Sequence, residues 1–161
     1  MMRKILITGI LAAVAAMTLV TSAPAQTAES HNQYDNLHKS KRFMFLHGQV
    51  FINGAAANAG DEVAVYSDSG VLCGTGTIKK DGVLPAIPIY KDDPRTDIVD
   101  GAKPGQTLYF AIWDADRKNE YHVDEVAVEM SAETDNTDMP TWTYANDVVR
   151  VKLLASDKAH D

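Results

Sequence analysis

Short runs of alternating apolar and polar residues, each followed by turn-forming residues, make up the chain from residue 42 onward. This two-residue period is typical of a strand with one buried face. Seven segments show it or form a short apolar run of strand length: Phe43–Ile52, Glu62–Tyr66, Val71–Ile78, Val83–Tyr90, Thr107–Trp113, Tyr121–Met130 and Val148–Leu154. After the first 25 residues no segment has a convincing helical period, so the sequence predicts an all-β protein.

Turn chemistry refines this prediction. Asn53-Gly54 follows the first segment and predicts a hairpin, because both residues tolerate a positive φ. Pro85 and Pro88 cannot donate backbone hydrogen bonds, so the segment that holds them is expected to be an edge strand or a broken one. Each apolar sheet face needs a second sheet to cover it. We therefore expect residues 42–161 to form one immunoglobulin-like antiparallel β-sandwich of about seven strands.

The N-terminal residues predict export. Arg3 and Lys4 precede the apolar run Ile5–Val20, and Ala23-Pro24-Ala25 resembles a cleavage site. This order is typical of a secretory signal peptide, so residues 1–25 are interpreted as removed on export to the periplasm or beyond the cell.

Residues 26–41 form a polar leader. Tyr34 and Leu37 are its bulky apolar residues, so it buries too little surface to offset the entropy of ordering. We expect a flexible segment, or at most a short arm that docks through Tyr34 and Leu37.

Charge and composition exclude several functions. The formal net charge is −7, and loss of the two cationic residues in the signal peptide would make it −9. An acidic chain without a basic stripe is a poor ligand for nucleic acid. The longest apolar run is shorter than the roughly 20 residues of a membrane span and lies in the predicted signal peptide. Cys73 is the only cysteine, so an intrachain disulfide is impossible and stability depends on the core.

An acidic loop is the strongest candidate for a metal site. The loop holds Asp92, Asp93, Asp97 and Asp100. Carboxylate oxygens are ligands that Ca²⁺ prefers, so four aspartates in nine residues could converge on one ion. Their spacing matches no EF-hand loop, and the loop also holds three cationic residues. The alternative is that Asp92 and Asp93 accept hydrogen bonds within turns while Asp97 and Asp100 are solvated.

Trp142 and Tyr144 are candidate contact residues on the second long connection. Their rings could stack on a sugar or anchor a protein partner. Alternatively, they fold back and cover one end of the sandwich.

Evidence for catalysis is weak. Cys73 could pair with His47 or His122 as nucleophile and base, but it lies in mid-strand and lacks the sequence signature of a thiol enzyme. Free cysteine is usually a buried packing residue. The five histidines have no zinc-binding spacing. A further acidic group is interpreted as a charged hairpin tip: Asp114, Asp116, Glu120, Asp124 and Glu125.

The segment from Gly48 to about Asp114 resembles a recurrent module of exported bacterial proteins. The similarity rests on the order of seven motifs: N-G, G-D-E-V, G-V-L-C-G, D-G, D-D-P-R-T, D-G-A-K-P-G and L-Y-F. It implies a secreted β-sandwich and carries over no catalytic residues. The residues add a physical expectation, since Gly74 and Gly76 within a strand leave room for another backbone or a large ring.

Together these observations predict a non-catalytic exported binding or structural module that presents loops to a protein or a surface polymer. Its leader could join copies into a homo-oligomer by adding a strand to the edge Val83–Tyr90 of a neighbour. One alternative is a Ca²⁺-dependent carbohydrate-binding module that uses the aspartate loop with Trp142 and Tyr144. A weaker one is a small secreted hydrolase.

Overall fold

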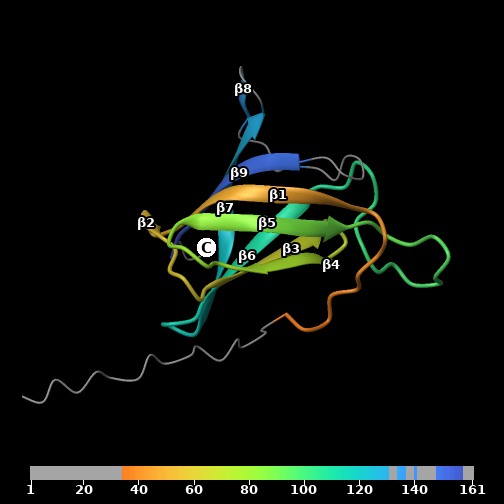
Figure 1. Cartoon of the computed structure of the whole chain (residues 1–161), viewed down its shortest axis with the longest axis horizontal. Helices are drawn as coiled ribbons and strands as arrows, with labels where there is room; N and C mark the ends of the chain where they lie inside the picture. The colour runs from red at the N-terminus through yellow and green to blue at the C-terminus, as the bar shows by residue number, and fades with distance from the viewer. Residues whose placement is uncertain (1–33, 131–133, 137–139, 141–147, 158–161) are drawn as a thin grey trace, which may run out of the picture.

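The computed structural model describes residues 34–130, 134–136, 140 and 148–157 (Figure 1). Within them the chain forms nine strands and no helix, which confirms the all-β prediction. The strands are β1 (Phe43–Ile52), β2 (Ala55–Ala56), β3 (Glu62–Ser67), β4 (Leu72–Thr77), β5 (Val83–Tyr90), β6 (Leu108–Asp114), β7 (Asn119–Met130), β8 (Thr134–Asn136) and β9 (Val148–Ala155). Seven of them match predicted segments. The short strands β2 and β8 were not predicted.

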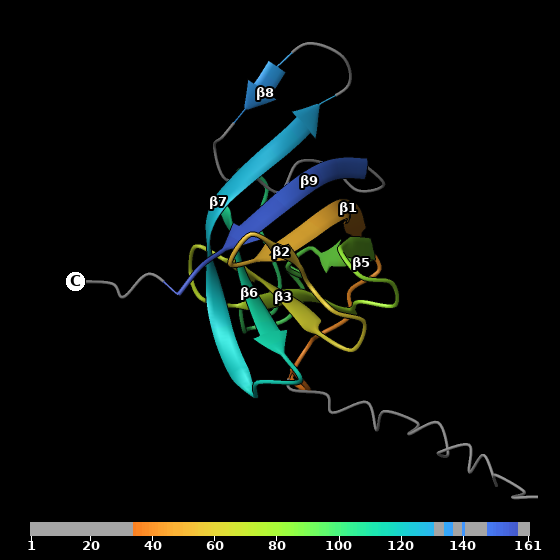
Figure 2. The same ribbon diagram turned by 90° about the vertical axis from the view of Figure 1, so that its left-hand side faces the viewer.

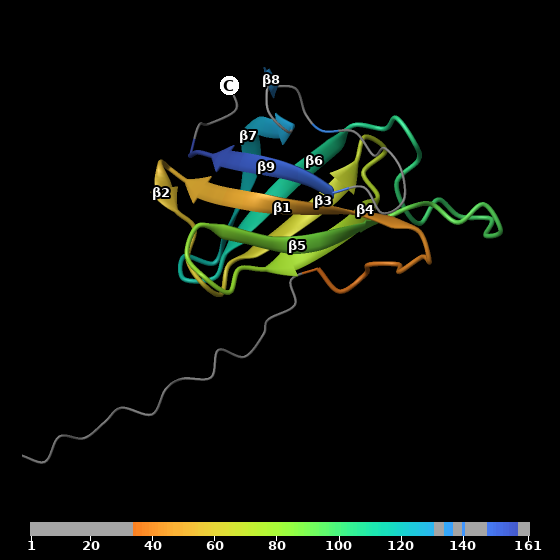
Figure 3. The ribbon, with the colours of Figure 1, turned by 45° about the horizontal axis from the view of Figure 1, so that its top comes forward.

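The strands form one curled, mixed sheet. Its order is β2-β1-β9-β7-β6-β3-β4, while β5 also pairs with β1 and β8 with β7. In Figure 2, the long strand β7 runs down one side of the curl. β9, β1 and β5 follow beside its upper part, and β6 and β3 follow beside its lower part. In Figure 3, β9, β1 and β5 lie side by side in front of β6 and β3.

The prediction of a purely antiparallel arrangement was wrong. β1 and β9 are parallel, in register from Phe45 opposite Val148 to Ile52 opposite Ala155. β5 and β2 both pair with one edge of β1. β9, the last strand, pairs with the other edge and runs parallel to β1. The ladder of β1 with β5 has an irregularity between Leu46 and Gly48, and such bulges increase the local twist.

Apolar side chains from both parts of the curl fill its interior. Among the fully buried ones are Met44, Leu46, Val63, Val65, Ile87, Ile89, Leu108, Ile112 and Leu153. They come from β1, β3, β5, β6 and β9, so strands far apart in the sequence share one core. The outward positions between them produce the alternation seen in the sequence.

Two local predictions are confirmed. Asn53 and Gly54 have φ values of 51° and 78° and join Ile52 to Ala55, the first pair of the β1–β2 hairpin. Among the described strands, β5, with its two prolines, forms a ladder only with β1.

β4 lies against the other side of β5 without forming a ladder with it, and glycines permit this close approach. A Cβ atom at Gly74 would lie 2.5 Å from Ile89 Cδ1 and 2.7 Å from the Pro88 carbonyl oxygen. A Cβ at Gly76 would lie 2.6 Å from Ile87 Cγ1. Gly74 therefore makes room for another backbone, as expected, whereas Gly76 makes room for the Ile87 and Pro85 side chains.

No helix in the described part of the chain is long and apolar enough to cross a membrane. Residues 1–33, which include the predicted signal peptide and the start of the leader, lie outside the described residues.

Candidate functional site

The loop between β5 and β6, residues 91–107, projects from one end of the curled sheet (Figure 1). Its two sides meet at its base. The Asp92 backbone N–H donates to the Ala102 carbonyl at 2.9 Å, and the Ala102 N–H donates to the Tyr90 carbonyl at 2.9 Å. A Cβ at Gly101 would lie 2.5 Å from the Lys91 carbonyl carbon, so the glycine allows this narrow closure.

Two aspartate side chains brace the loop above its base. Asp92 Oδ1 accepts a hydrogen bond from the Asp100 backbone N–H at 3.0 Å. Asp100 Oδ1 accepts one from the Asp93 backbone N–H at 3.1 Å. The Thr96 hydroxyl donates to Asp100 Oδ2 at 3.2 Å. Because the Asp100 side chain is buried, these bonds form away from competing water and hold the loop in one shape.

Asp93 is bound by its neighbour Arg95. The guanidinium donates from Nε to Asp93 Oδ1 at 2.9 Å and from Nη2 to Oδ2 at 2.6 Å. These bonds hold the pKa of Asp93 well below its usual range. The fourth aspartate, Asp97, is exposed near the tip.

This arrangement gives the calcium hypothesis no support. Asp92, Asp93 and Asp100 do lie together, but their oxygens accept hydrogen bonds from backbone N–H groups, Thr96 and Arg95. Within the described residues, no group of three or more His, Cys, Asp or Glu side chains is placed to hold a metal ion. Asp92 and Asp93 therefore match the turn interpretation, whereas Asp100 is buried and not solvated.

The tip of the loop exposes two aliphatic side chains. Ile98 is 67% exposed and Val99 is 45% exposed, among the most exposed large apolar residues in the described part of the chain. Single exposed apolar residues are common, but here two adjacent ones lie on a braced, projecting loop.

Residues 34–41 dock on the domain as a short arm (Figure 1). The Tyr34 hydroxyl donates to Glu120 Oε2 at 2.7 Å, and Leu37 is partly buried. His38 Nε2 lies 3.2 Å from Asp100 Oδ2, which joins the arm to the loop. Burial, followed by the bond to Glu120, raises the pKa of Tyr34. These contacts match the docking-arm alternative.

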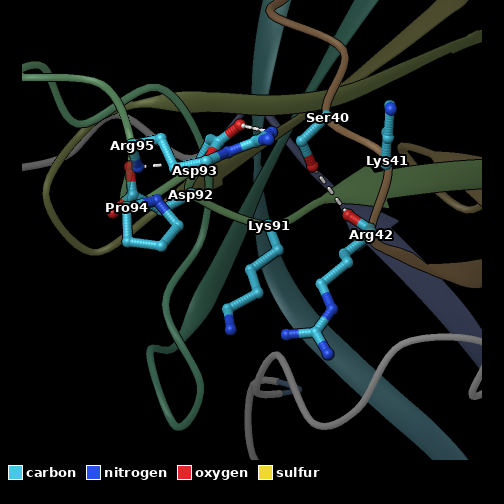
Figure 4. A pocket seen from close by; sticks show the side chains of 8 residues that line it. All are labelled: Ser40, Lys41, Arg42, Lys91, Asp92, Asp93, Pro94 and Arg95. Atoms are coloured by element: carbon cyan, nitrogen blue, oxygen red, sulfur yellow. Dashed lines mark hydrogen bonds and ion pairs between the residues drawn. The ribbon is translucent and has the colours of Figure 1, made fainter.

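A pocket of about 310 Å³ lies between the end of the arm and the base of the loop, and sequence reasoning missed it. Residues 40–42 and 91–95 line it (Figure 4). The Lys91 backbone N–H donates to the Arg42 carbonyl at 2.8 Å, and the Ser40 hydroxyl donates to the same oxygen at 2.8 Å. The sequence offered one signal, the basic residues Lys39, Lys41 and Arg42 in an acidic chain.

Cys73 is a core residue. Its side chain is fully buried, and its thiol donates to the Val71 carbonyl at 3.0 Å. Burial raises the pKa of the thiol to about 11, which disfavours the thiolate that a nucleophile needs.

Buried carboxylates support the hairpin turns at the other end of the sheet. Asp114 accepts hydrogen bonds from the Arg117 backbone at 2.8 Å and from its guanidinium at 2.7 Å. Asp61 accepts backbone N–H bonds from Asn58 and Ala115, at 2.8 and 3.0 Å. Burial raises the pKa of Asp61, and the two N–H donors oppose that shift. Asp61 and Asp114 thus serve as turn-stabilising groups.

Trp142 and Tyr144 lie outside the described residues, so their predicted contact role stays a prediction. Comparisons of the chain with protein-family models, curated proteins and solved structures returned no match.

Proposed function

We propose that the protein is a non-catalytic, exported binding module that contacts a protein partner through the tip of the 91–107 loop. The observation that carries this proposal is the exposed pair Ile98 and Val99 on a loop braced by Asp92 and Asp100. A loop that is already ordered loses little conformational entropy on binding, so more of its contact energy contributes to affinity. Ordered loops on a rigid β scaffold are common binding elements.

The candidate catalytic groups favour binding over catalysis. Cys73 is buried with a raised pKa, and Asp61 and Asp114 are bound to backbone groups inside the fold. Each has a structural reason for its position, so none of these three residues supports the hydrolase alternative.

We further propose that the curled sheet is a variant of the immunoglobulin-like sandwich. Its layers would be β5, β1 and β9 on one side and β4, β3 and β6 on the other, with β7 shared between them. The core shared by the two sides and the packing of β4 on β5 support this interpretation. A sandwich displays its loops at two ends, and the 91–107 loop would then be one of these display loops.

Site-specific photo-crosslinking tests the binding proposal. A photoreactive phenylalanine is placed at Ile98 and, as a control, at Val83, which is 42% exposed at the start of β5, the strand that ends before the loop. In cells that export the protein, we expect a specific protein adduct from position 98 and none from position 83. Equal labelling at the two positions, or none at 98, would contradict the proposal. An adduct of twice the chain's mass would identify a second copy as the partner.

Affinity measurements complete the test. With the purified partner, Ile98→Asp should weaken binding at least tenfold, since a buried hot-spot contact contributes about 2 kcal/mol or more. Its thermal midpoint should equal that of the wild type because Ile98 is exposed. If Ile98→Asp binds the partner as tightly as the wild type does, the tip of the loop is not the binding surface.

A further inference from the structure

The outer face of β3 and β6 is covered by a second, smaller contact. Val63 and Val65 of β3 are core residues, so the residues that alternate with them face outward. One of these, Ala64, pairs with Ala111 of β6. Both alanines are almost completely buried, although neither lies in the main cluster of core side chains. Their burial therefore comes from the outer side of the sheet.

Tyr34 of the arm lies on this outer side. Its hydroxyl donates to Glu120 Oε2 at 2.7 Å, near the start of β7. Burial and the bond to Glu120 raise the pKa of Tyr34. Smaller contributions to that shift come from Tyr66 and Glu62, so these β3 residues also lie near the phenol. Side chains of two strands thus surround Tyr34, which anchors the arm to the sheet.

The anchored arm reaches the projecting loop through His38. Figure 1 shows the arm, in orange, running toward the end of the domain from which the loop projects. His38 Nε2 lies 3.2 Å from Asp100 Oδ2. The His38 side chain is half exposed, and a contact of this kind contributes little by itself. Four residue steps from Tyr34 reach at most about 13 Å, so the anchor holds His38 at a high effective concentration beside the loop.

Asp100 is also the residue on which the shape of the loop depends. Its buried carboxylate accepts hydrogen bonds from the Asp93 N–H and the Thr96 hydroxyl. Ile98 and Val99, the exposed pair at the tip, directly precede Asp100 in the chain. A contact that holds the Asp100 carboxylate in place therefore restricts the motion of the tip.

We propose that the arm is a strap that controls the order of the projecting loop. While Tyr34 is seated on the sheet, His38 holds Asp100 and the tip keeps one shape. When Tyr34 leaves its seat, His38 moves away from Asp100 and the tip opens more often. Coupling between two sites is reciprocal, so a ligand that binds the ordered tip should in turn hold the arm on the sheet.

The consequence for binding rests on the proposed function. An ordered tip loses less conformational entropy when it binds a partner, so release of the arm should weaken partner binding at Ile98 and Val99. The coupling of arm and loop itself needs no partner and can be measured without one.

Amide hydrogen exchange, followed by NMR in the protein without a partner, tests the coupling. The reporters are the N–H groups of Asp93 and Asp100, which exchange when the loop opens locally. Tyr34→Ala removes the anchor and leaves the loop and His38 unchanged. We expect exchange about fivefold faster at both reporters, the effect of losing one weak contact. His38→Ala should give the same acceleration, and Lys39→Ala, at the exposed neighbouring position, should give none.

Two controls separate the strap from a general loss of stability. The N–H groups of Asn53 and Ala57 are bonded to the Ala155 and Val50 carbonyls, far along β1 from the arm. They should keep their wild-type exchange rates in every variant. The double variant Tyr34→Ala/His38→Ala should exchange no faster at the loop reporters than His38→Ala, because the anchor acts through His38.

Four results would overturn the proposal. These are unchanged exchange at Asp93 and Asp100 in Tyr34→Ala, equal acceleration at Asn53, equal acceleration by Lys39→Ala, or a double variant that exchanges faster than His38→Ala. Failure of the proposed function looks different. Normal partner binding by Ile98→Asp would contradict the tip as a binding surface and leave the exchange result unchanged.

Discussion

Asp92 and Asp100 brace the projecting loop from opposite sides of its base. The Asp92 carboxylate binds the backbone N–H of Asp100, and the Asp100 carboxylate returns to the backbone N–H of Asp93. Each side of the loop thus supplies both a donor and an acceptor to the other. The exposed residues at the tip owe their fixed position to this pair.

Removal of the Asp100 side chain should destabilise the fold. Asp100→Ala leaves the Asp93 N–H without its carboxylate acceptor in a partly buried place, a loss of about 1–3 kcal/mol in the free energy of unfolding. Urea denaturation measures this change. Asp97→Ala is the matched control, because Asp97 is exposed on the same loop and its loss should change stability by less than about 0.5 kcal/mol. Equal effects of the two variants would show that the loop is not braced by Asp100.

Calcium should not stabilise the protein. The oxygens of Asp92, Asp93 and Asp100 already accept hydrogen bonds from the chain, so ion binding would have to break them. We expect thermal unfolding curves in millimolar Ca²⁺ and in EDTA to coincide. Occupation of a native site at 100 times its Kd would instead add about 2.7 kcal/mol and raise the midpoint by several degrees. Such a shift, lost in Asp97→Asn, would restore the metal hypothesis.

Local sequence signals were sufficient to predict most of the strands. Seven segments have the two-residue period or an apolar run because one face of each is buried, and Asn53-Gly54 marks its hairpin through positive φ values. β2 and β8 have two and three residues, too few to show a period. The parallel pairing of β1 and β9 joins the first and last long strands, and no local pattern encodes it.

The candidate site was predictable only in part. The sequence identified the aspartate loop, but it could not decide between an ion and the backbone as the partner of each carboxylate, since that depends on the directions of the N–H groups. The pocket requires the register of β1 against β5, which places Arg42 beside Lys91 although 48 positions separate them in the chain. A basic leader segment was the only trace of it in the sequence.

Close packing of β4 on β5 should make Gly74 intolerant of a side chain. Gly74→Ala would place a methyl group 2.7 Å from the Pro88 carbonyl oxygen, and such overpacking costs about 1–3 kcal/mol. Urea denaturation measures this loss in the free energy of unfolding. Thr75→Ala is the matched control, because Thr75 is partly exposed at the next position of β4. It should lower the free energy of unfolding by less than Gly74→Ala does. A neutral Gly74→Ala would mean that the two strands separate readily, leaving β5 open to a strand from another copy.

Docking of the arm should depend on pH through Tyr34. Burial and the bond to Glu120 raise its pKa in the folded state, whereas an unfolded tyrosine ionises near 10.0. The native state therefore holds the phenol proton more firmly, and the contribution of Tyr34 to stability is complete below pH 10 and lost as the pH rises above it. Tyr34→Phe lacks the hydrogen bond, and residue 34 then has no proton to lose as the pH rises.

Denaturation of Tyr34→Phe and the wild type at pH 7, 9 and 10.5 checks this prediction. At pH 7 the variant should be less stable by about 0.5–1.5 kcal/mol, the contribution of one hydrogen bond. The difference in the free energy of unfolding should persist at pH 9 and shrink at pH 10.5. It shrinks because only the wild type loses stability through ionisation of Tyr34. Tyr109→Phe, on the exposed side of β6, gives the background for loss of a phenol elsewhere. A difference that stays constant with pH, or that matches Tyr109→Phe throughout, would mean that the arm is not held by the Tyr34 hydroxyl.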